Sequence, residues 1–243
     1  MKKSEIDYTA SVAKLDKRVA VPKYYFDELP KQLREMAFTV SNLETLRQIQ
    51  MVKRSLENAI DDGFSFESWK ETLPEEIFDK LSDARLETVY RTNLGIVYGQ
   101  STRFNAITSN VTPYLMYSAT GDDRTRESHQ KLDGIVKRAD SKFWDKYMPS
   151  WGYNCRCDAI PMTEAMAKSV GIDKNTPTVD DDGFGTRAMG DMMGSLEKDT
   201  NDAISALPKN SPYRAKFIEA QTNNKSLVDI WFQKNKAIFE QSE

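Results

Sequence analysis

Three side chains near the middle of the chain are of the types that bind transition metals or act as nucleophiles. They are Cys155, Cys157 and His129, the only cysteines and the only histidine of the 243 residues. Thiolate sulfur and imidazole nitrogen suit zinc, and a carboxylate such as Asp133 or Asp158, or a water molecule, is the candidate for a fourth ligand. The alternative is structural: two small buried cysteines, and an imidazole held by Asp133 or by a backbone carbonyl.

The spacing of the two cysteines weighs against a disulfide. The segment "CRCDAIPM" (residues 155–162) has the β-branched and apolar residues of a strand or extended edge. Alternate residues on one face of a strand lie about 6.4 to 6.8 Å apart, which is at the far edge of disulfide range. Residues 1–14 contain lysines but no apolar run resembling a signal peptide, so nothing indicates an oxidising compartment. The sequence therefore predicts reduced thiols.

Familiar catalytic patterns are missing around these residues. The chain has no G-x-S-x-G nucleophile elbow and no glycine-rich phosphate-binding motif. A zinc deaminase would need H-x-E followed by C-x-x-C, whereas this chain offers His129-Gln130-Lys131 and C-x-C. The sequence predicts a protein that is not an enzyme, with no catalytic residue assigned. A zinc hydrolase built on the same three ligands is the enzymatic alternative.

Charge is unevenly distributed along the chain. The net charge is −3, but residues 85–171 carry twelve Lys and Arg against nine Asp and Glu. This basic segment includes Arg124, Arg126 and Arg156, which are candidate contacts to nucleic acid or to an acidic partner. The structural alternative is ion pairing with the nearby acids Asp122, Asp123 and Glu127. No stretch reaches the roughly 18 consecutive apolar residues of a membrane span, so we expect no membrane partner.

Hydrophobic periodicity predicts a helical N-terminal region over residues 1–84. A helix is expected from Ser41, with Glu44 in capping-box spacing, to a stop at Gly63. A second, longer helical pattern runs over residues 75–105.

The pattern then changes to a small mixed module over residues 85–171. The segment "PYLMYSA" (residues 113–119) predicts a short strand, and Asp133-Gly134 predicts a turn. An aromatic-rich loop follows, and its aromatic residues are expected to form the local core; they are Phe143, Trp144, Tyr147, Trp151 and Tyr153.

Residues 172–243 form a third region, in which acidic residues and glycines are expected to form a linker. We expect the segment from Thr176 to Ser195 to be mobile, and the last helix, around Trp231, to present an apolar face for docking. The fold class is thus α+β: a helical N-terminal part, a small mixed α/β module with short strands, and a partly flexible C-terminal segment that ends in a helix.

Four motifs in a fixed order carry a resemblance to a known family. They are "YRTN" (90–93), "PYLMYSATGDDRTRESHQKLDG" (113–134), "FWDKYMP" (143–149) and "GYNCRCDAIPM" (152–162). Together they resemble the phage Mu F-like head morphogenesis family of minor capsid proteins, and the likeness extends over roughly residues 20–172.

The resemblance implies a low-copy structural protein of a tailed-phage or prophage head. Its expected partners are the portal and the capsid or scaffold proteins, and its expected location is the procapsid or virion, with assembly in the host cytoplasm. Two alternatives remain open: a DNA-contacting factor in packaging or ejection, and the delivery module of a polymorphic toxin. Zinc, if bound, would have a structural role.

Overall fold

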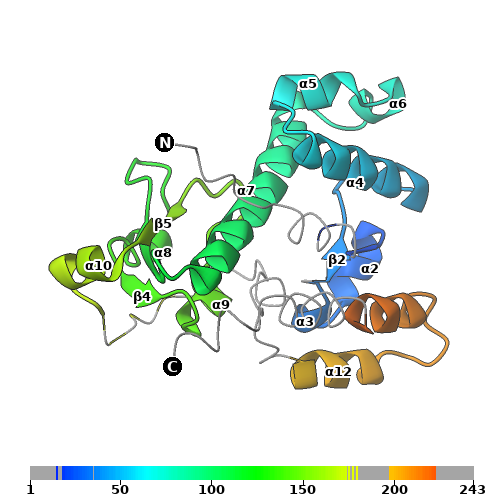
Figure 1. Cartoon of the computed structure of the whole chain (residues 1–243). Helices are drawn as coiled ribbons and strands as arrows, with labels where there is room; N and C mark the ends of the chain where they lie inside the picture. The colour runs from blue at the N-terminus through cyan, green and yellow to red at the C-terminus, as the bar shows by residue number, and fades with distance from the viewer. Residues whose placement is uncertain are drawn as a thin grey trace.

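The structure is a computed structural model that describes residue 15 and residues 18–34, 36–173, 175, 177, 179 and 197–222. One long helix, α7 (Asp83–Thr108), runs through the middle of it. Figure 1 shows helices α4, α5 and α6 near one end of α7 and the three-stranded sheet near the other. None of the helices in the described ranges has the length and apolar character needed to span a bilayer.

Helix α4 (Leu46–Asp61) is the first long helix. Thr45 caps it: the Thr45 hydroxyl accepts a hydrogen bond from the Gln48 backbone N–H, and the Gln48 side chain accepts one from the Thr45 N–H. The capping box was predicted at Ser41, but it lies at Thr45, four residues later. Asn42 adopts φ +75°, so the chain turns here and the helix begins only after Thr45. The predicted stop is confirmed, because Gly63 follows the helix with φ +70°.

The helical pattern predicted over residues 75–105 is two helices. Helices α5 (Phe66–Glu71) and α6 (Glu75–Phe78) are short, and α7 begins afresh at Ser82, whose hydroxyl accepts a hydrogen bond from the Arg85 N–H. The N-terminal half of α7 packs on α4 and α5 in a core with buried residues that include Ile49, Val52, Leu56, Trp69, Ile77, Leu86, Tyr90 and Val97. The boundary predicted at residue 84/85 thus falls in the first turn of α7.

The three-stranded antiparallel sheet has the order β4-β3-β5. Strand β3 (Tyr114–Ser118) confirms the predicted strand and lies between β4 (Val136–Arg138) and β5 (Asp158–Met162). The predicted turn before β4 is confirmed as well, with Gly134 at φ +78°. Pro161 lies in β5, and an edge strand is where a sheet tolerates proline.

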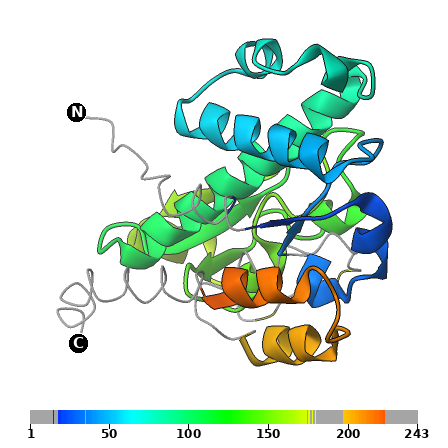
Figure 2. The same cartoon turned by 90° about the vertical axis from the view of Figure 1, so that its right-hand side faces the viewer.

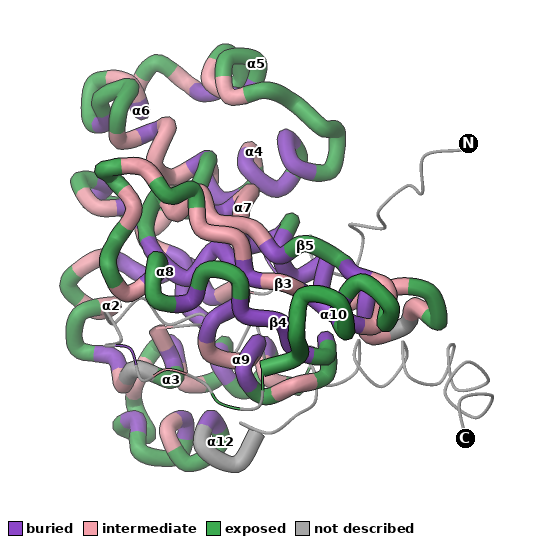
Figure 3. Tube along the Cα trace, turned by 90° about the vertical axis from the view of Figure 1, so that its left-hand side faces the viewer, coloured by how far each residue is buried: buried purple, intermediate pink, exposed green. Residues whose placement is uncertain are grey.

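Three short helices accompany the sheet: α8 (Glu127–Gln130), α9 (Phe143–Tyr147) and α10 (Glu164–Val170). The predicted aromatic loop thus contains a helical turn, α9. In Figure 3 the buried stretches of β3, β4 and α9 lie together in the interior, while most of α10 is exposed. The C-terminal half of α7 contributes to this second core through Ala106 and Ile107.

A third core joins the two ends of the described chain. Strands β1 (Val19–Ala20) and β2 (Ala37–Phe38) pair in parallel, with α2 (Lys23–Glu28) and α3 (Lys31–Arg34) between them. Helix α12 (Glu197–Ala206) and the helix over residues 214–222 pack against them (Figure 2). The shared buried residues include Val21, Leu33, Ile204, Tyr213 and Phe217.

No local sequence pattern indicated this third core. The segment from Thr176 to Ser195 that was expected to be mobile lies outside the described residues, apart from residues 177 and 179, and so does the predicted helix around Trp231. The α+β class, with helices first and a small mixed module after them, is confirmed. The three-part division of the chain stays a prediction.

Candidate metal centre

Four side chains from three separate segments converge on one point. His129 lies on α8, Cys155 and Cys157 lie in the loop before β5, and Tyr117 lies on the central strand β3. The Nδ1 atom of His129 is 3.4 Å from Cys157 Sγ, 3.5 Å from Cys155 Sγ and 3.4 Å from the Tyr117 hydroxyl. Ligand atoms of His129 and the two cysteines all lie within 4.8 Å of one another, so the structure brings together the three soft ligands that the sequence singled out.

Trp151 holds two members of this cluster in place. Its ring stacks on the imidazole of His129, with centroids 4.2 Å apart and planes 12° apart, and its Nε1–H donates a 2.7 Å hydrogen bond to the Tyr117 hydroxyl oxygen. His129 is 1% exposed and Tyr117 is fully buried. Stacking and burial thus fix the imidazole plane with Nδ1 directed toward the two thiols.

The two thiols are electrostatically unequal. Hydrogen bonding from Cys155, together with His129 and Tyr117, holds the pKa of Cys157 well below the usual thiol range. The same contact with Cys157, together with burial, raises the pKa of Cys155. Burial also raises the pKa of the Tyr117 hydroxyl, and the nearby thiols raise it further. The hydrogen bonds among these groups therefore favour one thiolate, which is the form of cysteine that binds a metal.

A tight turn presents the cysteines. Asn154 adopts φ +52°, in the left-handed region, and its backbone N–H donates a 2.9 Å hydrogen bond to the hydroxyl of Thr92 on α7. The strand or extended edge predicted over residues 155–162 is the edge strand β5 from Asp158 onward, and the two cysteines lie in the loop just before it. Both thiols are free, and the loop geometry brings each of them to the same imidazole nitrogen.

The two carboxylates considered as a fourth ligand do not belong to the group of ligand atoms that lie within 4.8 Å of one another. Asp133 accepts a 2.7 Å hydrogen bond from the backbone N–H of Ala119, the residue that follows β3. This bond holds the turn before β4 against the end of β3. Asp158 accepts one from the N–H of Ala159, and burial raises its pKa. The structure therefore groups the Tyr117 hydroxyl, rather than Asp133, with the imidazole and the two thiols.

The three arginines of the basic segment differ in their surroundings. Arg156 donates two 2.6 Å hydrogen bonds to the carboxylate of Asp122, and the guanidinium holds the pKa of Asp122 well below its usual range. Arg126 donates to the carbonyl of Tyr153. Arg124 projects outward, with 76% of its side chain exposed and a distant ion pair to Asp122. Two of the three thus connect the 119–126 loop to the cysteine segment.

The aromatic residues predicted as the local core are buried, with one exception. Phe143, Trp144, Tyr147 and Trp151 belong to the core under the sheet. Tyr153 is 56% exposed and lies beside the cleft described below.

Sequence reasoning missed two residues that build the site and one that joins α7 to the sheet module. Tyr117 on β3 looked like an ordinary core tyrosine, and Thr92 looked like an ordinary helical residue. Arg103 is fully buried on α7, where it donates a 2.9 Å hydrogen bond to the Ala139 carbonyl and pairs with Asp145 at 2.8 Å. An arginine in a helix is usually exposed, and nothing in the local sequence signals that this one crosses to the sheet module.

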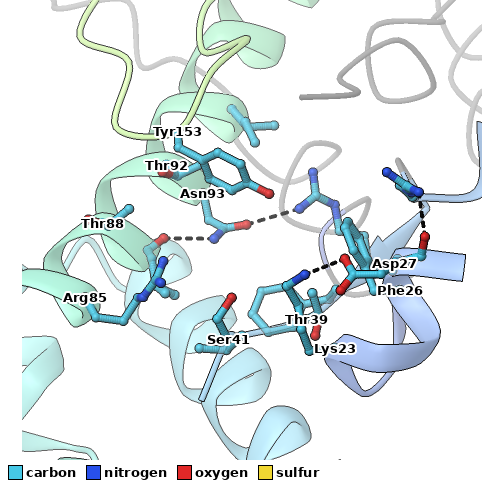
Figure 4. A pocket seen from close by; sticks show the side chains of 17 residues that line it. Lys23, Phe26, Asp27, Thr39, Ser41, Arg85, Thr88, Thr92, Asn93 and Tyr153 are labelled. Carbon is cyan, nitrogen blue, oxygen red and sulfur yellow. Dashed lines mark hydrogen bonds and ion pairs between the residues drawn. The ribbon is translucent and has the colours of Figure 1, made fainter. Parts of the chain in front are cut away.

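A second feature is a cleft of about 540 Å³ between α2, β2 and the N-terminal half of α7. Figure 4 shows Lys23 and Asp27 on one wall, with Arg85, Asn93 and Tyr153 around the opposite side. Its lining contains one acidic residue, Asp27, and four basic residues, which are Arg18, Lys23, Arg34 and Arg85.

Most of these charges have contacts within the chain. Lys23 pairs with Asp27, and Arg34 donates a hydrogen bond to the Asp27 carbonyl. Arg18 donates to the side chain of Asn93. The guanidinium of Arg85 makes no hydrogen bond or ion pair with any described residue. The cleft therefore has a cationic lining in which, as far as the described residues go, only the Arg85 guanidinium has no polar partner.

Comparison with known proteins agrees with the motif order. Residues 50–160 match the family described as "Phage Mu protein F like protein". The chain is 28% identical over 158 residues to the "Putative capsid assembly protein F" of Escherichia phage Mu, covering 56% of this chain and 36% of that protein. It is 32% identical over 125 residues to the "Mu-like prophage FluMu F protein" of Haemophilus influenzae, covering 51% of this chain and 28% of that protein.

The chain thus spans about a third of the length of these curated relatives. No solved structure matches it. The matched residues contain α7, strands β3 and β4 and the His–Cys–Cys cluster, so the candidate site lies within the matched region. The family resemblance expected from the four motifs is confirmed: residues 50–160 of this chain match the model of the phage Mu protein F like family.

Proposed function

We propose that this chain is a non-enzymatic structural component of a tailed-phage or prophage head, which acts in capsid assembly by binding other head proteins. The family of residues 50–160 and the capsid-assembly name of the phage Mu relative support this role. We expect the chain in the procapsid or virion, with portal, capsid or scaffold proteins as partners.

The surroundings of the cluster of His129, Cys155 and Cys157 support a structural role. His129 is 1% exposed and Tyr117 is buried, so a substrate would have little access to them. The surrounding polar contacts connect segments of the chain to one another: Thr92 to Asn154, Thr120 to Arg156 and Arg126 to Tyr153. A rigid module of this kind suits assembly, whereas a zinc hydrolase would need an open coordination position and a general base beside it.

The cationic cleft is the surface that we propose for docking. Its volume lies in the range of pockets that enclose a few side chains, and its charge is complementary to a carboxylate-bearing segment of a partner protein. Arg85 has no ion pair with a described residue and is the residue best placed to bind a carboxylate. A recessed cleft fits duplex DNA less well, because a duplex presents its phosphates along a convex cylinder and is bound by cations on open surfaces.

Co-assembly tests the role and the surface separately. Tagged chain would be expressed with the head genes of its phage, and particles would be isolated by sedimentation. We expect the unmodified chain to co-sediment with procapsids, and Arg85→Glu to reduce its incorporation about tenfold, which corresponds to roughly 1.4 kcal/mol. The control is Arg54→Glu, an exposed arginine of α4 that does not line the cleft, which should leave incorporation unchanged.

Each outcome decides one part of the proposal. Absence of the unmodified chain from all particles would overturn the head role. Normal incorporation of Arg85→Glu would overturn the cleft as the docking surface. Retention of the purified chain on duplex DNA at low salt, lost steeply as salt rises, would favour the DNA-contacting alternative instead.

A further inference from the structure

Three polar side-chain atoms converge on His129 Nδ1, and they cannot all donate a hydrogen bond to it. Three potential donors lie 3.4 to 3.5 Å from this one nitrogen: the Tyr117 hydroxyl and the thiols of Cys155 and Cys157. A neutral imidazole nitrogen has a single lone pair and accepts one good hydrogen bond. The Tyr117 oxygen also accepts a hydrogen bond from Trp151. Convergence of this kind is expected where all the groups share a central cation.

The distances agree with a tetrahedral zinc. Zinc bonds of about 2.3 Å to sulfur and about 2.0 to 2.1 Å to nitrogen give a nitrogen-to-sulfur edge of about 3.6 Å. The two Nδ1-to-sulfur distances are 3.4 and 3.5 Å. In the same tetrahedron, the distance between a nitrogen ligand and an oxygen ligand is about 3.3 Å. The distance from His129 Nδ1 to the Tyr117 oxygen is 3.4 Å. Small side-chain movements would complete the tetrahedron.

We infer that this cluster is a structural zinc site whose four ligands are His129 Nδ1, Cys155 Sγ, Cys157 Sγ and the Tyr117 oxygen. Tyr117 thus takes the position for which the sequence suggested Asp133. The Trp151 N–H stabilises negative charge on the tyrosine oxygen, as the outer partners of metal ligands commonly do. With four protein ligands the site is closed, which is the arrangement of structural rather than catalytic zinc.

The site would join three segments that are distant in the sequence. Tyr117 belongs to β3, His129 to α8, and the cysteines to the loop that precedes β5. Zinc binding would therefore hold the loop after α9 against the sheet and contribute its binding free energy to folding. This inference is independent of the proposed head role and holds for the isolated chain.

Metal analysis of the full chain is the primary test. Protein expressed in zinc-supplemented medium and purified under reducing conditions without chelator should contain about one equivalent of zinc. Reduced apoprotein should bind Co²⁺ with the visible bands of a tetrahedral site and a sulfur-to-cobalt charge-transfer band. Less than a tenth of an equivalent of zinc, together with no Co²⁺ spectrum, would overturn the inference without recourse to any variant.

Variants then assign the ligands. Cys157→Ser and Cys155→Ser should each lose the metal, and Tyr117→Phe should weaken zinc binding at least tenfold in a competition with a chromogenic chelator. Asp133→Asn is the matched control, because asparagine can still accept the hydrogen bond from Ala119, and it should keep full affinity. Unchanged affinity in Tyr117→Phe, or lost affinity in Asp133→Asn, would overturn the assignment of the fourth ligand.

Discussion

The hydroxyl of Thr92 on α7 accepts a 2.9 Å hydrogen bond from the backbone N–H of Asn154, 62 residues further along the chain. This bond connects the long helix to the turn that presents both cysteines. The neighbouring Asn93 acts in the same way toward the N-terminal region, since its side chain accepts a hydrogen bond from Arg18. The "YRTN" motif thus has a physical role: it joins the helix to segments before and after it.

Thr92→Val should lower the free energy of unfolding by about 1 kcal/mol, because valine keeps the shape of threonine but removes the acceptor for Asn154. Urea unfolding and amide hydrogen exchange at Asn154 measure the effect. Thr88→Val is the control: its hydroxyl donates only to the Ala84 carbonyl of the same helix. An equal effect in both variants would show that the Thr92 contact contributes nothing specific.

Gly99→Ala should be strongly destabilising although alanine favours helices. A Cβ atom at Gly99 would lie 1.6 Å from the carbonyl oxygen of Pro149, which is backbone and cannot move aside easily. We expect a loss of about 3 kcal/mol or more. Gly95→Ala is the graded control, since its Cβ would lie 3.1 Å from the Ser150 side chain and needs only a small shift. Thermal unfolding compares the two, and similar melting temperatures would contradict the close approach.

Arg103→Met should lower stability by about 3 to 5 kcal/mol, because it leaves the Asp145 carboxylate largely buried without its partner. Arg91→Met is the control on the same helix: Arg91 pairs with Glu87 in an exposed ion pair, so its loss should cost less than about 1 kcal/mol. Combining Arg103→Met with Asp145→Leu should recover part of the loss. Urea unfolding of the three variants measures these differences in stability. A double variant less stable than Arg103→Met would contradict the idea that the unpaired Asp145 carboxylate causes the loss.

The ion pair between Asp122 and Arg156 should make stability depend on pH in the acid range. Arg156 lowers the pKa of Asp122 in the folded chain below its ordinary value of 3.8. A lowered folded pKa contributes stability above the unfolded pKa, and that contribution is lost as the pH falls through the folded pKa.

Asp122→Asn should therefore be less stable than the unmodified chain at pH 7 and pH 5, and the difference should shrink as the pH falls below about 4. Urea unfolding at several pH values measures this difference. NMR titration of the Asp122 carboxyl group gives its pKa directly. A stability difference that grew on acidification, or a titration at the ordinary pKa, would contradict the predicted role.

The parts of the fold that local patterns determine were predictable. The α4 and α7 periodicities, the strand at residues 113–119 and the turn at Gly134 all follow from side chains close together in the sequence. The position of the cysteines was not predictable in this way. Strand β5 begins where it starts to pair with β3, and in that pairing Asp158 lies opposite Ser118. This register depends on contacts between residues far apart in the sequence.

The same reasoning applies to the candidate site. Cys155, Cys157 and His129 were recognisable because their types are rare in this chain and chemically distinctive. Tyr117 was not, because a tyrosine on a strand is ordinary and only its distance of 3.4 Å from the imidazole reveals a further role. The packing of residues 197–222 against β1, β2 and α3 depends on contacts across most of the chain, which no local pattern encodes.

Helix α7 has a mechanical consequence. Its 26 residues span about 39 Å at 1.5 Å per residue, and they are buried in the N-terminal core at one end and in the core beneath the sheet at the other. A sharp kink between these ends would disrupt helical hydrogen bonds. A load applied to the N-terminal helices would therefore reach the sheet and the cysteine turn as a rigid displacement, and the two ends of the module would move as one body under stress.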